Sequence, residues 1–554
     1  MRKNPATRLI AGIVVLLLAG GCGTSGSDRP SAGQDHRGGT LHILDQSDFD
    51  HLDPARNYPP SQLHLETLYA PTLTSYVNAP GLAGTEVGAD AATDTGRPNA
   101  DATQWSFTLR DNLTWQDGRP VTCADFRYGV NRSFSDLLPG GPTYQKAYLR
   151  GGDTYSGIYQ DPRGIPSVTC SEQTITYQLK YPVPDFRYAV SMGIFAAVRQ
   201  DRDTRTKYDD QPFSYGPYMI KTHVRDQSLT LVRNPYWDQG LDHIRKNLPD
   251  VLSFTFGLSR EVITDRLIQD RDTDQQTIPF ANTTVSPEQL SQVLGNPKLR
   301  SRTFSGYTGS TSFIAINTRK VPDVRCRQAY SYAMNKQTYV TVLGGPATGD
   351  YANTVAGPSM KAYRAAPATD PRGDPAKARQ LLAQASDCPR TIKYDYAQTP
   401  VSDRTAAAVK DAFARAGITV LPTPIARKEF YSTVGKPGTE DELVNTGFIP
   451  DWPSGAALYP PLFDGRQILS DGNSNFSLLD DPKVNQAIRA AEAEPDTRKA
   501  QTLWAQVDRL VMESAAIIPL QYVKVVILTG SKVTGARMHS EYFDISLLNV
   551  GVTT

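Results

Sequence analysis

The side chains that most often carry out catalysis are present in this chain, but none of them falls into a catalytic spacing. No two of the seven histidines lie three or four residues apart, so no helix presents a zinc-binding pair. The Gly-Lys dipeptide at 435–436 is followed by proline, which excludes a phosphate-binding loop, and no GxSxG nucleophile motif occurs. The acidic pairs at 209–210 and 480–481 lie in polar, turn-like segments, where carboxylates are usually solvated or cap backbone groups. We therefore expect no enzyme, no cofactor and no metal site, although a triad built from distant residues would escape this search.

The cysteines are spaced for structure rather than for redox or metal chemistry. They are Cys22, Cys123, Cys170, Cys326 and Cys388, and no CxxC spacing occurs. The last four form an even set, which is typical of disulfides in an oxidising compartment. Four cysteines can form two disulfides in three different pairings. The alternative to disulfides is that these cysteines are free, buried thiols.

The N-terminal segment indicates export. Three bases within the first eight residues precede an apolar run over 9–19, which is too short to span a bilayer and is typical of a secretory signal peptide. The run ends in Leu-Ala-Gly-Gly before Cys22 and resembles a bacterial lipobox, where the signal is cut and the cysteine is lipidated. Residues 23–37 are rich in Gly, Ser and Asp, so we expect a lipoprotein signal peptide over 1–21 and a flexible tether over 22–37. An ordinary signal peptide with an incidental Cys22 is the alternative.

Composition and charge bound the remaining functions. The chain has 554 residues with 58 Lys+Arg and 57 Asp+Glu, a balance that excludes strong attraction to nucleic acid. A mean hydropathy of −0.41 excludes a polytopic membrane protein. At roughly 150 residues per domain, the length predicts several domains with a large core.

Hydrophobic periodicity predicts mixed α/β structure in more than one lobe. The expected strands are 40–44, 105–110, 174–179, 311–317, 391–396 and 418–421. Helices are expected to begin at or near Asp323, Asp374, Ser402 and Asp496, which are residue types that favour helix starts. The helix after Ser402 should stop at Gly417, so residues 391–421 are predicted to form a βαβ unit.

Several motifs occur in a fixed order along the mature chain. The longest is the block WSFTLRDNLTWQDGRPVTCADF at 105–126. The others are GGTL at 38–41, LDP at 52–54, GPY at 216–218, LVRNPYW at 231–237, FIAINT at 313–318, the helix over 374–385 and IPL at 518–520. In this order they resemble the extracellular solute-binding proteins of family 5, the peptide- and nickel-binding lipoproteins that serve ATP-driven importers. The resemblance covers about residues 38–550.

Most of these motif residues have a structural interpretation. Trp105, Phe107, Trp115 and Trp237 are expected in the core rather than stacked on a ligand. The Asp-Gly pair at 117–118 predicts a tight turn, because glycine tolerates positive φ. The motifs therefore mark the fold and not the binding site.

The resemblance implies an α/β fold of the bilobal periplasmic-binding-protein clamp type (class C, type II-like), with an extra small domain in the first lobe. Lobe I would comprise 38–79, 212–308 and 521–554, the extra small domain 80–211, and lobe III 309–520. Crossovers near residues 308 and 520 would form a hinge, so that the lobes close over a ligand.

The resemblance also places a binding site at 447–453 (GFIPDWP), the family segment in which an aromatic and a carboxylate line the pocket. By position it implies ligand contacts from Gly447, Phe448, Ile449, Asp451 and Trp452. Asp451 would hold the α-ammonium of a peptide whose main chain pairs with this segment, as in strand addition. Ser454 stands where the family commonly has an acidic residue, which leaves the ligand class open. The alternative for Asp451 is a turn residue that caps its own backbone.

The resemblance therefore implies a monomeric, lipid-anchored receptor at the cell surface or in the periplasm. It would capture an oligopeptide and deliver it to the permease and ATPase subunits of an ABC importer. The implied domains favour the disulfides Cys123–Cys170 and Cys326–Cys388, since each pair then lies within one domain. The rivals are the same clamp for a non-peptide solute (oligosaccharide, metal chelate or opine), an exported hydrolase, and a structural surface lipoprotein.

Overall fold

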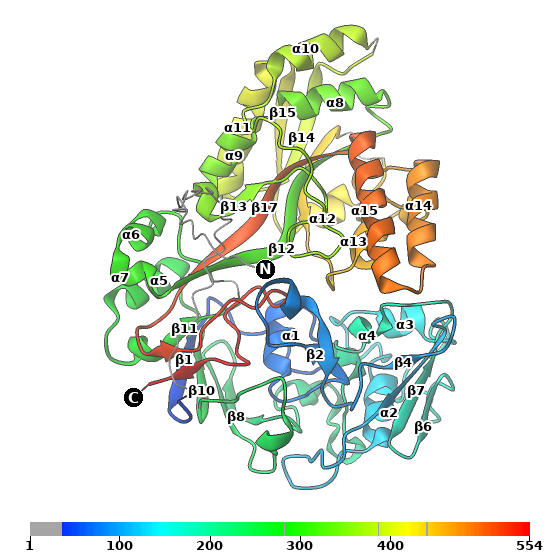
Figure 1. Ribbon diagram of the computed structural model, residues 1–554, viewed down its shortest axis with the longest axis vertical. Helices are drawn as coiled ribbons and strands as arrows, with labels where there is room; N and C mark the ends of the chain where they lie inside the picture. The colour runs from blue at the N-terminus through cyan, green and yellow to red at the C-terminus, as the bar shows by residue number, and fades with distance from the viewer. Residues whose placement is uncertain (1–35, 282, 386, 439–440, 554) are drawn as a thin grey trace, which may run out of the picture.

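The chain folds into two lobes that follow one another along the longest axis of the molecule and are joined by two long strands (Figure 1). The computed structural model describes residues 36–281, 283–385, 387–438 and 441–553. The predicted signal peptide, Cys22 and nearly all of the predicted tether lie outside the described residues. Within those ranges, no helix is both long enough and apolar enough to cross a membrane.

The lower lobe in Figure 1 contains a five-stranded sheet in the order β11-β1-β10-β9-β8. The predicted first strand is β1 (Thr40–Leu44), which is parallel to both of its neighbours and buries Leu41 and Ile43 completely. The other strands of the sheet are β8 (Tyr218–Val224), β9 (Ser228–Arg233), β10 (Val251–Thr255) and β11 (Thr277–Pro279). Around it lie α1 (Pro60–Glu66), α5 (Arg260–Gln269), α6 (Leu290–Gly295), α7 (Pro297–Arg300) and the short pairs β2 (Thr74–Tyr76)–β3 (Val87–Ala89) and β18 (Val533–Thr534)–β19 (Gly551–Val552).

A second, four-stranded sheet is formed by the segment that the resemblance assigns to an extra small domain. Its order is β4 (Arg97–Pro98), β5 (Gln104–Thr108), β7 (Thr174–Gln178) and β6 (Val168–Ser171), and its helices are α2 (Cys123–Arg132), α3 (Tyr144–Tyr148) and α4 (Phe186–Ala189). The predicted alternation in β5 is confirmed, because Trp105 and Phe107 are buried between partly exposed neighbours. The predicted disulfide Cys123–Cys170 joins the start of α2 to β6.

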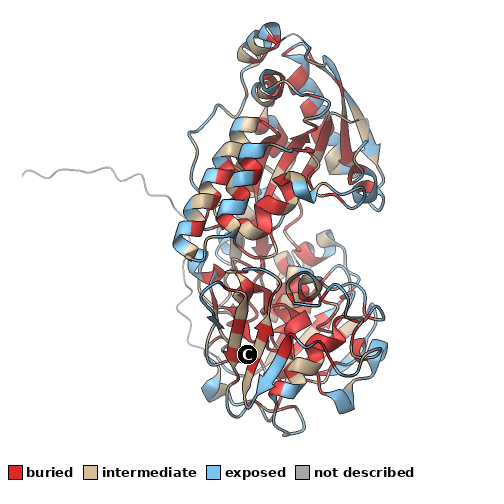
Figure 2. Ribbon diagram, turned by 90° about the vertical axis from the view of Figure 1, so that its right-hand side faces the viewer, coloured by how far each residue is buried: buried red, intermediate tan, exposed pale blue. Residues whose placement is uncertain are grey.

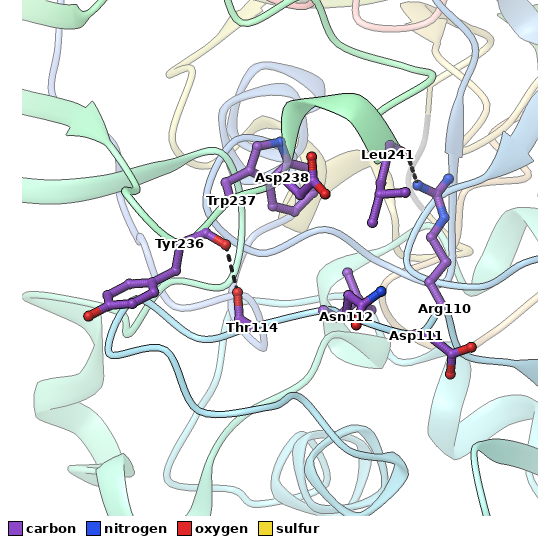
Figure 3. Close-up of a pocket in the computed structure, with 9 residues that line it drawn as sticks. Arg110, Asp111, Asn112, Thr114, Tyr236, Trp237, Asp238 and Leu241 are labelled. Atoms are coloured by element: carbon purple, nitrogen blue, oxygen red, sulfur yellow. Dashed lines mark hydrogen bonds between the residues drawn. The ribbon is translucent and has the colours of Figure 1, made fainter.

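The long sequence block at 105–126 is structural, as predicted. Trp115 is fully buried, and Gly118 has a φ of 81° in the expected turn. The Thr114 hydroxyl donates to the carbonyl of Tyr236 at 2.7 Å, and the Arg110 guanidinium donates to the carbonyl of Leu241, so the block is bonded to the segment after β9 (Figure 3). The hollow between these residues measures about 10 Å³, which is barely room for one water molecule.

The upper lobe is built on a six-stranded sheet in the order β13-β17-β12-β16-β14-β15. Its strands are β12 (Thr303–Ile316), β13 (Gly349–Tyr351), β14 (Thr391–Ala397), β15 (Thr419–Ile425), β16 (Leu443–Phe448) and β17 (Ile517–Leu528). The predicted βαβ unit is confirmed, since β14 and β15 are parallel neighbours joined by α11 (Pro400–Ala414). That helix begins earlier than predicted, because Thr399 rather than Ser402 caps it and Pro400 occupies its first turn.

Two hydrophobic cores form within this lobe, and Figure 2 shows the buried strands between helices whose outer faces are exposed. One core contains residues of α8 (Val324–Ala333), α9 (Lys336–Val342), α10 (Pro375–Gln384) and α11. The other contains residues of α12 (Phe430–Val434), α13 (Gly455–Phe463), α14 (Pro482–Glu492) and α15 (Thr497–Ser514). The predicted disulfide Cys326–Cys388 fastens α8 to the segment after α10.

Strands β12 and β17 run from one lobe into the other, and the predicted crossovers near residues 308 and 520 fall on them (Figure 1). β12 is longer than the predicted strand 311–317, because its first half pairs with the end of β17, from Thr303 opposite Leu528 to Tyr307 opposite Lys524. The regular pairing is interrupted between Tyr307 and Thr311, close to the predicted hinge. Such a break leaves fewer backbone bonds to resist bending.

Candidate functional site

The predicted binding segment begins at the end of β16 and continues into the loop before α13. Gly447 and Phe448 are the last residues of β16, and they lie opposite Ser312 and Thr311 of β12. A Cβ atom at Gly447 would lie 3.3 Å from the carbonyl oxygen of Thr311, so glycine lets the two strands approach closely here. The Phe448 side chain packs against the core of the upper lobe, whereas Ile449 is exposed.

Asp451 reaches across the boundary between the lobes. The Tyr58 hydroxyl donates to its two carboxylate oxygens at 3.0 and 3.1 Å, and the Tyr144 hydroxyl donates to Oδ2. Tyr58 precedes α1 and Tyr144 begins α3, so both donors come from the lower half of the molecule. The Asp451 carboxylate bonds to side chains of the opposite lobe, and within the described residues it accepts no hydrogen bond from its own backbone.

Asp451 is a buried carboxyl group without a cationic partner among the described residues. Burial raises its pKa, and the hydrogen bonds from Tyr144 and Tyr58 offset this only in part. Within the described ranges, no Lys, Arg or His nitrogen forms an ion pair with it. A cation that binds next to a buried carboxylate with only neutral donors around it stabilises the ionised form of that carboxylate.

Trp452 fixes the position of its neighbour Asp451. It is 2% exposed and belongs to the core of the lower half, although it is carried by a loop of the upper lobe. Its ring centroid lies 4.9 Å from that of Tyr144. Ser454, two residues on, is the N-cap of α13 and accepts a hydrogen bond from the amide of Ala456 at 3.3 Å. Serine at this position therefore has a structural use.

A second polar contact between the lobes was not predicted from the sequence. The Lys361 ammonium of the upper lobe lies 2.5 Å from a carboxylate oxygen of Glu86 and donates to the Tyr188 hydroxyl at 2.9 Å. Burial lowers the pKa of Lys361, but Tyr188 and Glu86 outweigh this effect and the net shift is upward. This lysine is therefore charged at neutral pH and is already neutralised by Glu86.

A further carboxylate, Glu541, is buried in the lower lobe close enough to sense Asp451. Burial raises the pKa of Glu541 well above its usual range, and the Asp451 charge raises it further. A hydrogen bond from Tyr76 and the charge of Lys361 act in the opposite direction. The boundary between the lobes thus holds two buried carboxyl groups, Asp451 and Glu541, and the raised pKa of each means that both resist ionisation until a cation joins them.

Tyr58, Tyr144, Lys361 and Glu541 were missed because no spacing relates them to Asp451. Tyr58 is 393 residues away and Tyr144 is 307 residues away along the chain. For the two tyrosines, the one sequence signal is the high tyrosine content of 27 residues in the chain, and no sequence signal points to Lys361 or Glu541.

Two lobes joined by crossover strands, with polar side chains meeting between them, define a clamp-type solute-binding protein. Residues 86–469 match the model of the family described as "Bacterial extracellular solute-binding proteins, family 5 Middle". The chain belongs to this family, and it is accordingly a substrate-binding protein and not an enzyme.

Individual relatives extend the similarity over most of the chain. The solved structure named "Clavulanic acid biosynthesis oligopeptide binding protein 2" is 32% identical, covers 95% of this chain and 97% of its own, and superposes with a TM-score of 0.87. The periplasmic oligopeptide-binding protein OppA of Salmonella typhimurium is 25% identical over 93% of this chain and 92% of its own length. The dipeptide-binding protein DppE of Bacillus subtilis is 22% identical over 79% of each chain.

Proposed function

We propose that this protein is the lipid-anchored extracellular receptor of an ATP-driven importer, and that it captures an oligopeptide between its two lobes. The observation that carries the proposal is Asp451, a carboxylate between the lobes that accepts hydrogen bonds from two tyrosine hydroxyls and forms no ion pair with any described residue. The α-ammonium of a peptide is the group that would complete this arrangement. The names of the relatives support the peptide assignment, since they are described as oligopeptide- or dipeptide-binding.

The segment around Asp451 offers further contacts to a peptide. Gly447 lies near the end of β16 against the β12 backbone, and the exposed Ile449 beyond it can meet a ligand side chain. Trp452 holds the loop in place from the buried side. In this proposal Gly447, Phe448, Ile449, Asp451 and Trp452 form one wall, while Tyr58 and Tyr144 form the other.

Delivery to the importer follows from closure of the clamp around its ligand. A ligand that touches both lobes stabilises the closed form, and this form is what a permease can recognise. We further propose that Cys22 carries the lipid that holds the receptor at the membrane, with the tether giving the clamp reach. The protein would act as a monomer with the permease and ATPase subunits as partners.

Native mass spectrometry of protein purified without denaturation tests the ligand class. The proposal predicts a retained mass that fragments into amino acids. A retained oligosaccharide, metal chelate or opine would instead support the same clamp acting on a non-peptide solute.

A further inference from the structure

Glu541 is the second buried carboxyl group at the boundary between the lobes, and the proposed peptide contacts do not use it. It lies in the turn over 539–543, where Nδ1 of His539 accepts a hydrogen bond from the amide of Glu541 at 3.2 Å. The same turn packs against the hinge, because a Cβ atom at Gly309 would lie 2.7 Å from the ring of Phe543. Glu541 is thus fixed at the base of the clamp, close to the break in the pairing of β12 and β17.

The Glu541 side chain faces the upper lobe. Its pKa responds to the charges of Asp451 and Lys361, two residues that the upper lobe contributes to the boundary. The Tyr76 hydroxyl donates a hydrogen bond to it, and Tyr76 ends β2, which lies on the side of the lower lobe nearest the upper lobe (Figure 1). Glu541 is 8% exposed, and neither of its carboxylate oxygens is a sealed atom without a partner. The carboxyl group therefore borders the space between the lobes, where a ligand can reach it.

Glu541 has no cationic partner in the part of the chain that the structure describes. The cation that acts on its pKa is Lys361, which lies 2.5 Å from a Glu86 oxygen and donates to the Tyr188 hydroxyl at 2.9 Å. Lys361 is therefore already engaged. His539, in the same turn as Glu541, is neutral because burial lowers its pKa to about 3.

Two neighbouring buried carboxyl groups cannot both ionise without compensating positive charge. Burial raises the pKa of Glu541 well above its usual range, and the charge of Asp451 raises it further. The α-ammonium of a peptide at Asp451 would neutralise only one of the two groups. Full pairing therefore requires a ligand with two cationic groups a short distance apart.

We propose, on the basis of the peptide function proposed above, that the preferred peptide begins with a basic residue, lysine or arginine. Its α-ammonium pairs with Asp451, and its side chain pairs with Glu541. A basic first residue carries both cations on one Cα atom, which matches two carboxyl groups that lie close enough to affect each other. Glu541 is then the residue that determines specificity for the first side chain.

Calorimetry with two series of peptides that differ only in the charge of the first side chain tests this inference. One series begins with lysine and the other with norleucine, each followed by one to five alanines, and both carry the α-ammonium. The wild type should bind the lysine series roughly 10- to 150-fold more tightly, the range for a hydrogen bond to a charged group. Equal affinities would overturn the inference and leave the proposed peptide function standing, whereas binding of neither series would overturn both.

Matched variants assign the preference to one side chain. Glu541→Gln keeps the size of the side chain but cannot ionise, so it should abolish the preference for lysine. Its affinity for the norleucine series should stay unchanged, which also shows that the variant is folded. Glu513→Gln makes the same substitution at the exposed end of α15 and should keep the preference. An unchanged preference in Glu541→Gln would refute the assignment.

Proton release gives a second readout that a purely structural role of Glu541 would not change. Because its pKa is raised, Glu541 in the ligand-free protein holds a proton more tightly than an ordinary glutamate does. Pairing with a lysine ammonium expels this proton to the buffer. Binding enthalpies in buffers of different ionisation enthalpy should therefore report more proton release for the lysine series than for the norleucine series. The difference should vanish in Glu541→Gln, and its absence in the wild type would contradict the inference.

Discussion

Replacing Tyr144 by phenylalanine should loosen the contact between the lobes without disturbing either lobe. The hydroxyl of Tyr144 donates to Asp451 from the opposite side of the boundary, while its ring packs against Trp452. Tyr144→Phe keeps the ring contact and removes one hydrogen bond to a carboxylate. Such a bond contributes about 1.5–3 kcal/mol. The ratio of touching to separated lobes should therefore fall roughly 10- to 150-fold.

Small-angle scattering of the ligand-free protein measures this change as a larger radius of gyration. Tyr148→Phe is the matched control, because Tyr148 lies on the same helix α3 and its hydroxyl forms no hydrogen bond in the described structure. Its radius of gyration should equal that of the wild type. Tyr58→Phe should act like Tyr144→Phe, since Tyr58 donates to both oxygens of Asp451. If Tyr144→Phe and Tyr148→Phe scatter identically, the bond between the lobes does not hold them together and the reasoning fails.

Three further predictions concern the anchor and the stability of the fold. Cys22→Ala should release the protein into the medium at normal abundance, and membrane retention of this variant would contradict lipidation at Cys22. Removing the Cys326–Cys388 disulfide, which closes a separation of 62 residues, should cost roughly 3–5 kcal/mol of unfolding free energy in denaturant titrations; four alkylatable thiols in the native secreted protein would show that the bonds do not form. Burial raises the pKa of Asp508 to about 7, so the folded state holds a proton on this side chain more tightly than the unfolded state does. The contribution of this proton to the free energy of unfolding is fully present below the unfolded pKa and is lost as the pH rises through about 7. Melting temperatures between pH 5 and 8 should therefore fall less steeply in Asp508→Asn than in the wild type, and equal slopes would count against this role of Asp508.

The parts of the fold that depend on local sequence were predictable. The alternation in β5 and the caps at Asp323, Asp374 and Asp496 each follow from a few adjacent residues, and all are present. The early start of α11 shows the limit of this reasoning, because Thr399 and Pro400 together define a better helix start than Ser402. The extra length of β12 was not predictable, since its partner strand β17 lies more than 200 residues further along the chain.

Only the part of the candidate site that the upper lobe contributes was predictable from the sequence. Residues 447–452 are contiguous, so a motif can mark them, whereas the groups that meet Asp451 come from separate elements of the other half. Tyr58 and Tyr144 acquire their role only when the lobes approach each other. The same holds for Lys361 with Glu86, whose pairing depends on the arrangement of whole lobes and not on any spacing in the sequence.

The most direct test of the central claim is a binding cycle with Asp451→Asn and an N-acetylated form of the peptide that the native protein retains. An α-ammonium buried against Asp451 forms a charge pair, and loss of one partner typically costs about 2–5 kcal/mol of binding free energy. Calorimetry should therefore show a roughly 30- to 5,000-fold loss of affinity for either change alone. The second change should add little to the first, because both remove the same interaction. Equal affinity of the wild type for the free and the acetylated peptide would contradict the claim that Asp451 holds the amine of a peptide.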